Sequence, residues 1–137
     1  MSSATQFNKG NHCVYSMYVH LIFVTKYRKK IFDKTILKFA SLIFNSVCDS
    51  FDAQLLEFEG EKDHVHMLIA YHPKVSVSKL VNILKGRSSR YLKLKFPYLK
   101  KYYWKSALWS SSFFASSCGG APISVLKEYI RHQKAPT

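Results

Sequence analysis

The middle of the chain reads Gln54-Leu-Leu-Glu-Phe-Glu-Gly60-Glu-Lys-Asp63-His-Val-His-Met-Leu-Ile-Ala70, with short apolar runs on both sides of a single glycine. Short runs of this kind, separated by a turn residue, are typical of neighbouring strands. We therefore predict one strand from Gln54 to Glu59, a turn at Gly60 and a second strand from Asp63 to Ala70.

The sequence predicts one amphipathic helix before this strand pair in the chain and another after it. Asp33 can cap the first helix, whose apolar residues recur at helical spacing: Ile36, Phe39, Ala40, Ile43, Val47 and Phe51. The second helix is expected from about Ser76 to Leu94. We expect its buried side to carry Val77, Leu80, Leu84, Tyr91 and Leu94, and its other side Lys79, Asn82, Lys85, Arg90 and Lys93.

Two outer strands and a last helix complete the predicted fold. The segment from Val14 to Thr25 is rich in β-branched and aromatic residues, as in a long strand, and a fourth strand is expected near Leu108 to Ala115. Two glycines and a proline in residues 119–122 break the chain before a helix that Ser124 can cap and that runs through Gln133. The order β-α-β-β-α-β predicts an α+β, ferredoxin-like fold: an antiparallel sheet with two helices on one face, followed by a C-terminal helix.

The length of the chain suits one compact domain. With 137 residues, two domains would each lack a sufficient core, so we predict a single domain over 1–137 with a polar N-terminal arm at 1–12. The longest apolar run, Val19 to Val24, is too short to span a membrane, and from the polar start we expect no secretion signal. The three scattered cysteines suit reduced thiols, and we expect a cytoplasmic protein.

The charge of the chain indicates a polyanionic partner. There are 21 Lys and Arg against 8 Asp and Glu, a formal net charge of +13 that opposes folding by self-repulsion. Nucleic acid is the first candidate and an anionic membrane the second. Each single cation could also belong to a solvated helix face. We predict DNA contacts at a basic turn and on the second helix, by Lys26, Arg28, Lys29, Lys30, Lys85, Arg87 and Arg90.

Two further features fit a nucleic-acid partner. Tyrosines and tryptophans between Tyr98 and Trp109 are interleaved with lysines, a composition that suits stacking on the bases of single strands. Gly86 interrupts the second helix at a cost of ~1 kcal/mol relative to alanine. Close approach of a phosphate backbone would explain this glycine, and so would a helix-packing contact.

The triplet His64-Val65-His66 is the first candidate for chemistry. Side chains alternate along a strand, so His64 and His66 share one face and can hold one metal ion between them. Asp63 and Glu61 could be further ligands or could orient the histidines. The alternative is that the histidines are ordinary surface residues, hydrogen-bonded to neighbours.

The last predicted helix is the second candidate. Tyr129 and Gln133 are four residues apart and share one side of this helix. A tyrosine at such a position is more often part of a core, and a lone glutamine is more often exposed to solvent. These two residues become informative only in combination with the histidine triplet.

In combination, these motifs resemble the single-tyrosine HUH transposases, the transposase A family of the smallest bacterial and archaeal insertion sequences. The triplet resembles the HUH motif (His, hydrophobic, His) of HUH nucleases, and the late Tyr129 with Gln133 resembles the tyrosine helix of the family. The likeness extends over roughly 14–133 and includes five blocks, one of which contains the triplet. These are Thr25-Lys-Tyr-Arg-Lys-Lys30, Glu61-Lys-Asp-His-Val-His66, Leu84-Lys-Gly-Arg-Ser-Ser-Arg90, Leu108-Trp109 and Gly119-Gly-Ala-Pro122.

The resemblance implies an activity and a set of roles. It makes Tyr129 the nucleophile, and His64, His66 and Gln133 the ligands of a divalent ion, Mg²⁺ or Mn²⁺. The implied reaction cleaves and rejoins single-stranded DNA with terminal hairpins through a 5′-phosphotyrosine. It further implies a homodimer whose active sites are shared between chains, with Gly119 and Gly120 as a hinge before the tyrosine helix.

Two other functions stay open on the sequence alone. A non-catalytic module on the same scaffold would bind single-stranded nucleic acid, and the histidines would be structural. A metal-dependent nuclease would use activated water, with Tyr129 in the core. A covalent protein–DNA adduct would distinguish the transposase from both.

Overall fold

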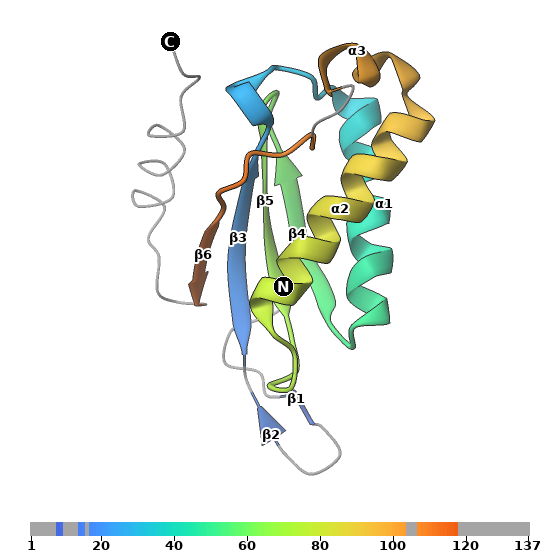
Figure 1. Ribbon diagram of the computed structural model, residues 1–137. Helices are drawn as coiled ribbons and strands as arrows, with labels where there is room; N and C mark the ends of the chain where they lie inside the picture. The colour runs from blue at the N-terminus through green and yellow to red at the C-terminus, as the bar shows by residue number, and fades with distance from the viewer. Residues whose placement is uncertain (1–7, 10–13, 16, 104–106, 118–137) are drawn as a thin grey trace.

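The computed structural model of the protein describes residues 8–9, 14–15, 17–103 and 107–117. This part of the chain contains both strands and helices (Figure 1). In order they are β1 (Asn8–Lys9), β2 (Val14–Tyr15), β3 (Tyr18–Val24), η1 (Lys26–Arg28), α1 (Lys34–Ser50), β4 (Gln54–Gly60), β5 (His64–Ala70), α2 (Val77–Lys95), η2 (Pro97–Leu99), α3 (Lys100–Tyr103) and β6 (Phe114–Ser117).

The main sheet has four antiparallel strands in the order β4-β5-β3-β6, and α1 and α2 cover one of its faces (Figure 1). This arrangement confirms the predicted α+β, ferredoxin-like fold. The predicted C-terminal helix, with Tyr129 and Gln133, lies outside the described residues, as do Gly119 and Gly120.

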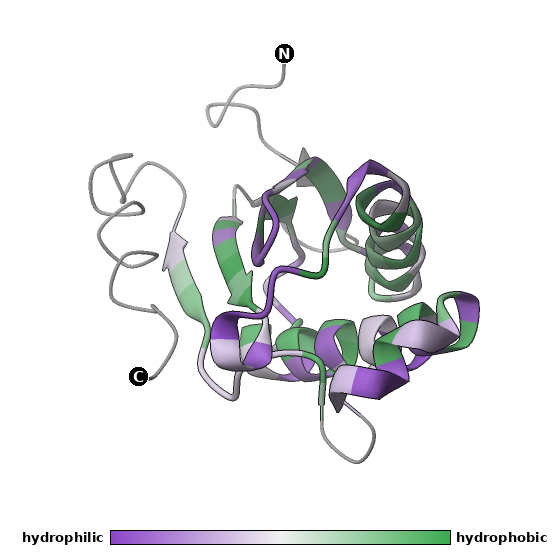
Figure 2. Cartoon of the chain, turned by 90° about the horizontal axis from the view of Figure 1, so that it is seen from above, coloured by the Kyte–Doolittle hydropathy of each residue, from purple (hydrophilic) through white to green (hydrophobic). Residues whose placement is uncertain are grey.

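Strand β5 shows how the sheet separates its two faces. Val65, Met67 and Ile69 are almost completely buried and belong to the core, whereas His66 and Leu68 are only partly buried. Seen from above, the strands are mostly hydrophobic, and both helices alternate hydrophobic and hydrophilic residues along their turns (Figure 2). The alternation therefore directs the two histidines of β5 to the face opposite the helices.

Helix α1 begins at the predicted cap, Asp33, and α2 begins directly after Ser76, which the sequence gives as its approximate start. The Asp33 carboxylate accepts a hydrogen bond from the backbone N–H of Ile36 at 2.8 Å, and the Ser76 hydroxyl accepts one from Lys79 at 3.2 Å. In α1 the predicted stripe is confirmed at Ile36, Ala40, Ile43 and Val47, which are buried, while Phe39 and Phe51 are partly buried.

Two strand boundaries differ from the prediction. The expected strand from Val14 to Thr25 is two strands, because β2 pairs with β1 and β3 begins only at Tyr18. The expected strand near Leu108 to Ala115 is shorter and later, since β6 spans Phe114–Ser117.

Trp109 explains why the segment before β6 is not a strand. Its indole packs on the rings of Phe23, Phe32 and Phe44, and its Nε1 donates to the Ser88 hydroxyl at 2.8 Å. Its strand-like pairing is limited to an isolated bridge with Thr25. The segment is therefore anchored to the core by its side chain rather than by a backbone ladder.

The buried side of α2 also differs from the prediction. Tyr91 and Leu94 are 43% and 57% exposed, and the buried residues are Leu80, Val81, Leu84, Ser88, Ser89 and Leu92. Ser88 and Ser89 can face the core because each hydroxyl has a partner: Ser88 accepts from Trp109 Nε1, and Ser89 accepts from the backbone N–H of Leu108. The buried side of α2 therefore includes two hydrogen-bonded serines, Ser88 and Ser89, and not the predicted Tyr91 and Leu94. No helix in the described part of the chain is long and apolar enough to cross a membrane.

Candidate functional site

His64 and His66 lie at the start of β5, on the face of the sheet that the helices leave open. Their rings are stacked, with centroids 6.4 Å apart and an angle of 27° between the planes. The side chain of His64 is 10% exposed and that of His66 is 42% exposed. The prediction that the two rings share a face is confirmed, and the geometry places two imidazole donors beside each other.

Asp63 holds His64 in a defined orientation. One carboxylate oxygen of Asp63 lies 2.9 Å from His64 Nδ1, and the other accepts hydrogen bonds from Arg28 Nε and Nη2 at 2.8 and 2.7 Å. Burial tends to raise the pKa of Asp63, but the hydrogen bonds from His64 and Arg28 outweigh burial and lower it. Because an ionised carboxylate only accepts hydrogen bonds, Nδ1 carries the proton and Nε2 of a neutral ring keeps its lone pair for a metal ion.

The turn that carries Arg28 is tied to the start of β5. The backbone N–H of Thr25 donates to the Asp63 carbonyl at 2.9 Å, and the Thr25 hydroxyl donates to the Lys29 carbonyl at 2.8 Å. Tyr27 and Arg28 have positive φ angles of 64° and 52°, which cost backbone energy in residues other than glycine. This unusual backbone directs the guanidinium of Arg28 toward Asp63.

His66 has an acidic neighbour on the next strand. Its Nε2 lies 3.7 Å from a carboxylate oxygen of Glu59, the residue that pairs with His66 across the β4–β5 ladder. The pKa of His66 is lowered, chiefly by burial and against the opposing charges of Glu59 and Glu61, so the neutral ring that metal binding requires is favoured. We did not predict Glu59 from the sequence, because the turn was expected at Gly60, whereas in the structure Gly60 ends β4 and pairs with Val65.

The described residues supply part of a metal site. Within 8–9, 14–15, 17–103 and 107–117, no three His, Cys, Asp or Glu side chains form a group that could hold a metal ion. The two imidazoles fit a divalent transition metal, because both rings are on one face and burial lowers the pKa of His66. Of the four residues predicted for the catalytic set, the structure brings His64 and His66 together, and Tyr129 and Gln133 lie outside the described residues.

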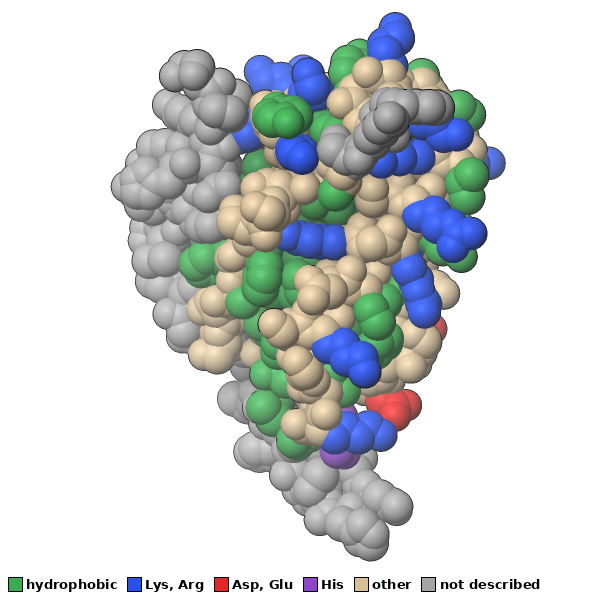
Figure 3. Space-filling view, viewed as in Figure 1, with side chains coloured by type: hydrophobic (Ala, Val, Ile, Leu, Met, Phe, Trp, Pro, Cys, Tyr) green, Lys and Arg blue, Asp and Glu red, His purple; other side chains and the backbone are tan. Residues whose placement is uncertain are grey.

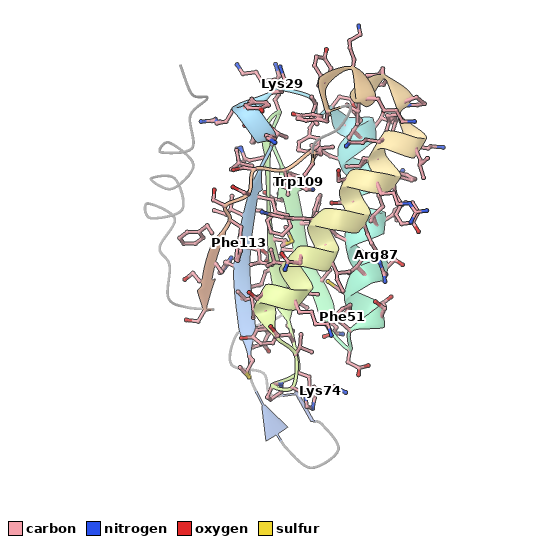
Figure 4. All side chains as sticks on the ribbon, viewed as in Figure 1. Lys29, Phe51, Lys74, Arg87, Trp109 and Phe113 are labelled. Atoms are coloured by element: carbon pink, nitrogen blue, oxygen red, sulfur yellow. The ribbon has the colours of Figure 1, made fainter. Side chains whose placement is uncertain are left out.

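The basic turn lies at the same end of the sheet as His64, and Lys29 is labelled there in Figure 4. Lys30 is exposed, whereas the ammonium groups of Lys26 and Lys29 lie 5.5 and 5.4 Å from the ring centres of Tyr27 and Tyr102. Arg28 differs from its neighbours, because its guanidinium is paired with Asp63.

The predicted cations of α2 also differ from one another. Lys85 is half-buried, and its ammonium donates to the carbonyls of Ser110 and Ser112 at 2.7 and 3.0 Å. Arg87 and Arg90 are exposed, and none of the ion pairs found among the described residues includes them. Figure 4 shows Arg87 on the helical side of the molecule, and in Figure 3 Lys and Arg clearly predominate over Asp and Glu on the face that is drawn.

Residues 13–133 match the family model described as transposase IS200 like. The chain belongs to this family. The match covers both the histidine pair and the segment that contains Tyr129 and Gln133, so the predicted family resemblance is confirmed.

Individual members of the IS200-like transposases support the assignment. The chain is 31% identical over 127 residues to the transposase for insertion sequence element IS200 of Salmonella typhimurium, covering 89% of this chain and 80% of that protein. It is 28% identical over 99 residues to the ISDra2 transposase TnpA of Deinococcus radiodurans, covering 72% and 71% of the two chains. The protein is therefore a DNA transposase by family.

Solved structures agree with this fold. A Deinococcus radiodurans protein, solved as a candidate transposase, superposes with a TM-score of 0.86 at 29% identity and covers 94% of this chain and 99% of its own. A REP-associated tyrosine transposase bound to a REP hairpin superposes with a TM-score of 0.54 at 13% identity, covering 96% and 68%. The second likeness shows the fold alone.

Proposed function

We propose that this IS200-like transposase cleaves and rejoins single-stranded DNA at insertion-sequence ends through a 5′-phosphotyrosine intermediate. Tyr129 is the nucleophile, and His64, His66 and Gln133 hold a divalent metal ion. The observation that carries the proposal is the pair of stacked imidazoles at the start of β5, one of which is oriented by Asp63.

The proposed reaction exchanges one phosphoester for another. The Tyr129 oxygen attacks phosphorus, the bond from phosphorus to the 3′ oxygen breaks, and the 3′ oxygen leaves as a hydroxyl after taking up a proton. Since a tyrosine with a pKa of ~10 is mostly protonated at neutral pH, its proton has to be removed as it attacks. A second 3′-OH then attacks the phosphotyrosine and releases Tyr129, so strands are rejoined without any external source of energy.

The protein's own contribution to the metal site is orientation. Asp63 fixes the ring of His64 with Nε2 free, and the closeness of His66 makes a two-imidazole donor set. A bound ion would polarise the phosphate and stabilise charge on the leaving oxygen. Two imidazoles with one amide oxygen suit Mn²⁺ better than Mg²⁺, so we expect Mn²⁺ to support activity at least as well.

Family and charge support the proposed partners. The substrate is single-stranded DNA with terminal hairpins, held by the cations of the basic turn and of α2; a solved relative in fold is bound to a REP hairpin. The active protein is a homodimer that shares its active sites, with Gly119 and Gly120 as the hinge of the tyrosine helix, and it works in the cytoplasm.

An adduct assay tests this proposal. The full chain is incubated with labelled single-stranded element ends and Mn²⁺, denatured and separated by size. We expect a denaturation-resistant protein–DNA adduct that disappears in Tyr129→Phe, while the variant still binds the DNA. An adduct with the Phe variant would place the nucleophile on another tyrosine, and cleavage without any adduct would favour a nuclease that uses activated water.

A further inference from the structure

Arg28 belongs to the basic turn by sequence, but its side chain faces Asp63. Its neighbours Tyr27 and Lys30 are exposed, whereas the side chain of Arg28 is only 19% exposed. Its Nε and Nη2 atoms both donate to the same oxygen of Asp63, at 2.8 and 2.7 Å. The charge of Arg28 is therefore offset within the chain, in a position where a guanidinium can fix the direction of a carboxylate.

The carboxylate of Asp63 is held from two sides. One oxygen, Oδ2, accepts both hydrogen bonds from Arg28, and the other, Oδ1, lies 2.9 Å from Nδ1 of His64. Rotation of the carboxylate about its bond to Cβ would break the contacts on both sides. Because Arg28 opposes this rotation, Oδ1 stays opposite Nδ1, and Nε2 of the neutral His64 ring keeps its lone pair.

The backbone of the turn is strained in the conformation that brings Arg28 to Asp63. Tyr27 and Arg28 both have left-handed φ angles, 64° and 52°, which are unfavourable for residues with a Cβ atom. The N–H of Arg28 donates to the Thr25 carbonyl at 2.9 Å, and the N–H of Thr25 donates to the Asp63 carbonyl at 2.9 Å. The turn is thus attached to Asp63 through its backbone and through a side chain, which indicates that this geometry serves a function.

The charge of Arg28 cannot be what favours a metal ion at the histidines. A guanidinium close to His64 repels a divalent cation, and Asp63 without its arginine would attract the ion more strongly than the pair does. The contribution that the Arg28–Asp63 pair can make to metal binding is therefore the orientation of the His64 ring.

We propose that Arg28 is a positioning residue of the metal site. It holds the Asp63 carboxylate in the orientation that keeps the proton on Nδ1 of His64 and leaves Nε2 to the metal ion. This inference rests on the proposed function, because it takes His64 as a ligand of the ion. It moves Arg28 from the predicted DNA contacts to the support of the histidine, while Lys30 keeps its predicted role at the DNA.

Calorimetric titration of the full chain with Mn²⁺ tests the proposal by the sign of the effect. Arg28→Met removes a positive charge, which by charge alone would strengthen binding of the ion. Loss of the orientation weakens binding, and we expect the affinity to fall by about tenfold, as for other partners that orient a metal ligand. Lys30→Met is the matched control, because it removes one charge from an exposed position of the same turn and should not weaken binding. An unchanged or higher affinity in Arg28→Met would overturn the proposal.

A double variant shows whether Arg28 acts through Asp63. In the Asp63→Asn background, Arg28→Met should cause no further loss of affinity, since the carboxylate that Arg28 holds is already gone. Losses that multiply in the double variant would mean that Arg28 acts independently of Asp63, against the proposal.

A conservative variant covers the case in which Arg28→Met does not fold, which circular dichroism would show. Arg28→Lys keeps the charge but supplies one ammonium in place of two donors in a plane. Its affinity for Mn²⁺ is expected to lie between those of the parent and Arg28→Met. A folded Arg28→Lys variant that binds Mn²⁺ as tightly as the parent would contradict the need for the two donors.

The ring of His64 gives a readout that needs no metal ion. Nitrogen-15 chemical shifts of the neutral imidazole show which ring nitrogen carries the proton. In the metal-free parent we expect the proton on Nδ1, and in Arg28→Met a substantial fraction on Nε2. Identical shifts in the two proteins would refute the positioning role.

The two readouts together separate this inference from the proposed function. If the parent binds no Mn²⁺ but the proton of His64 moves in Arg28→Met, the proposed metal site fails and the role of Arg28 in orienting the ring stands. If the parent binds Mn²⁺ and Arg28→Met binds it equally well, the metal site stands and the role of Arg28 fails.

Binding of a fluorescein-labelled thymidine 15-mer, without metal, tests whether Arg28 contacts DNA. Lys30→Met is expected to reduce the slope of log affinity against log salt by ~0.7, the value for one phosphate contact on a single strand. Arg28→Met should keep the slope of the parent. A slope reduced in Arg28→Met, with the affinity for Mn²⁺ unchanged, would return Arg28 to the DNA contacts and rule out the positioning role.

Discussion

The charged side chains around the start of β5, where the two histidines lie, are arranged differently from those around the cavity between α2 and the segment 107–111. At the histidine end, Arg28 and His64 share the carboxylate of Asp63, and Glu59 approaches His66. Around the cavity, the described lining residues include four cations and no acid. The first region is oriented by acidic partners within the chain, while the described lining of the second contains no acidic side chain. Substitutions should therefore change geometry in one region and affinity for DNA in the other.

The largest effect is expected from removing a histidine. In His66→Ala the metal loses an imidazole, and several kcal/mol of charge stabilisation correspond to a loss of cleavage of about 10³-fold or more. Because the side chain of His66 is 42% exposed, the free energy of unfolding should change by only about 0.5 kcal/mol. Calorimetric titration with Mn²⁺ measures the site, and an unchanged affinity would contradict the assignment of His66 as a ligand.

A smaller effect is expected from the residue that orients His64. Asp63→Asn keeps the size of the side chain but no longer fixes the proton on Nδ1, so the affinity for Mn²⁺ should fall by about 10–100-fold. Glu61→Gln is the matched control, because it removes one negative charge from an exposed position near the same histidines. Equal losses of affinity in the two variants would show that net charge, and not orientation, is what Asp63 supplies.

The cations of α2 should change the salt dependence of binding. Arg87→Ala and Arg90→Ala are each expected to reduce the slope of log affinity against log salt by about one unit on a hairpin stem, and by somewhat less on a single strand. Lys74→Ala is the control, because Lys74 is an exposed cation that already pairs with Asp52 at 3.2 Å. If all three variants match the parent, the DNA path runs over the turn at 26–30 and not over α2.

The smallest effect concerns Lys85, whose pKa is lowered by burial from 10.5 to about 8. Between these values the unfolded chain binds one more proton than the folded one, so this residue makes the protein more stable as the pH rises from about 8 to 10.5. Lys85→Met lacks this contribution, while Tyr103, with a pKa raised to about 12 by burial, titrates in both chains. Urea unfolding at about pH 7 and about pH 10 should show the parent gaining stability relative to the variant; an equal change in both would contradict the shift.

Strands and helices with a regular pattern of apolar residues could be predicted from the sequence. Elements whose position depends on the packing of one side chain could not. The two strands at 54–70 and the cap of α1 at Asp33 agree with the structure, because alternation and capping are local properties. The position of β6 could not be found in this way, since it depends on Trp109 packing against residues far away in the chain. The same contact brings Ser88 and Ser89 into the core, which helical spacing of apolar residues alone cannot show.

The sequence predicted which residues belong to the candidate site better than it predicted the contacts between them. The pattern His64-Val65-His66 correctly placed two imidazoles on one face, since strand geometry alone requires it. The pairing of Arg28 with Asp63 was not predictable, because it depends on positive φ angles in a basic turn whose composition indicates only DNA binding. The predicted roles of Lys26, Lys29, Lys30, Arg87 and Arg90 stay predictions.

Thr25 connects the basic turn to the start of β5 and to the segment around Trp109. Its N–H and hydroxyl bond to Asp63 and Lys29, its carbonyl accepts from Arg28, and it forms a bridge with Trp109. Amides in such a junction exchange with solvent only when a large part of the structure opens, whereas those at the ends of an edge strand exchange by local fraying. In deuterium oxide, the Thr25 amide should therefore be protected for much longer than those of β6. The hydrogen bond that holds Asp63 beside His64 would then stay intact while the edge of the sheet opens transiently.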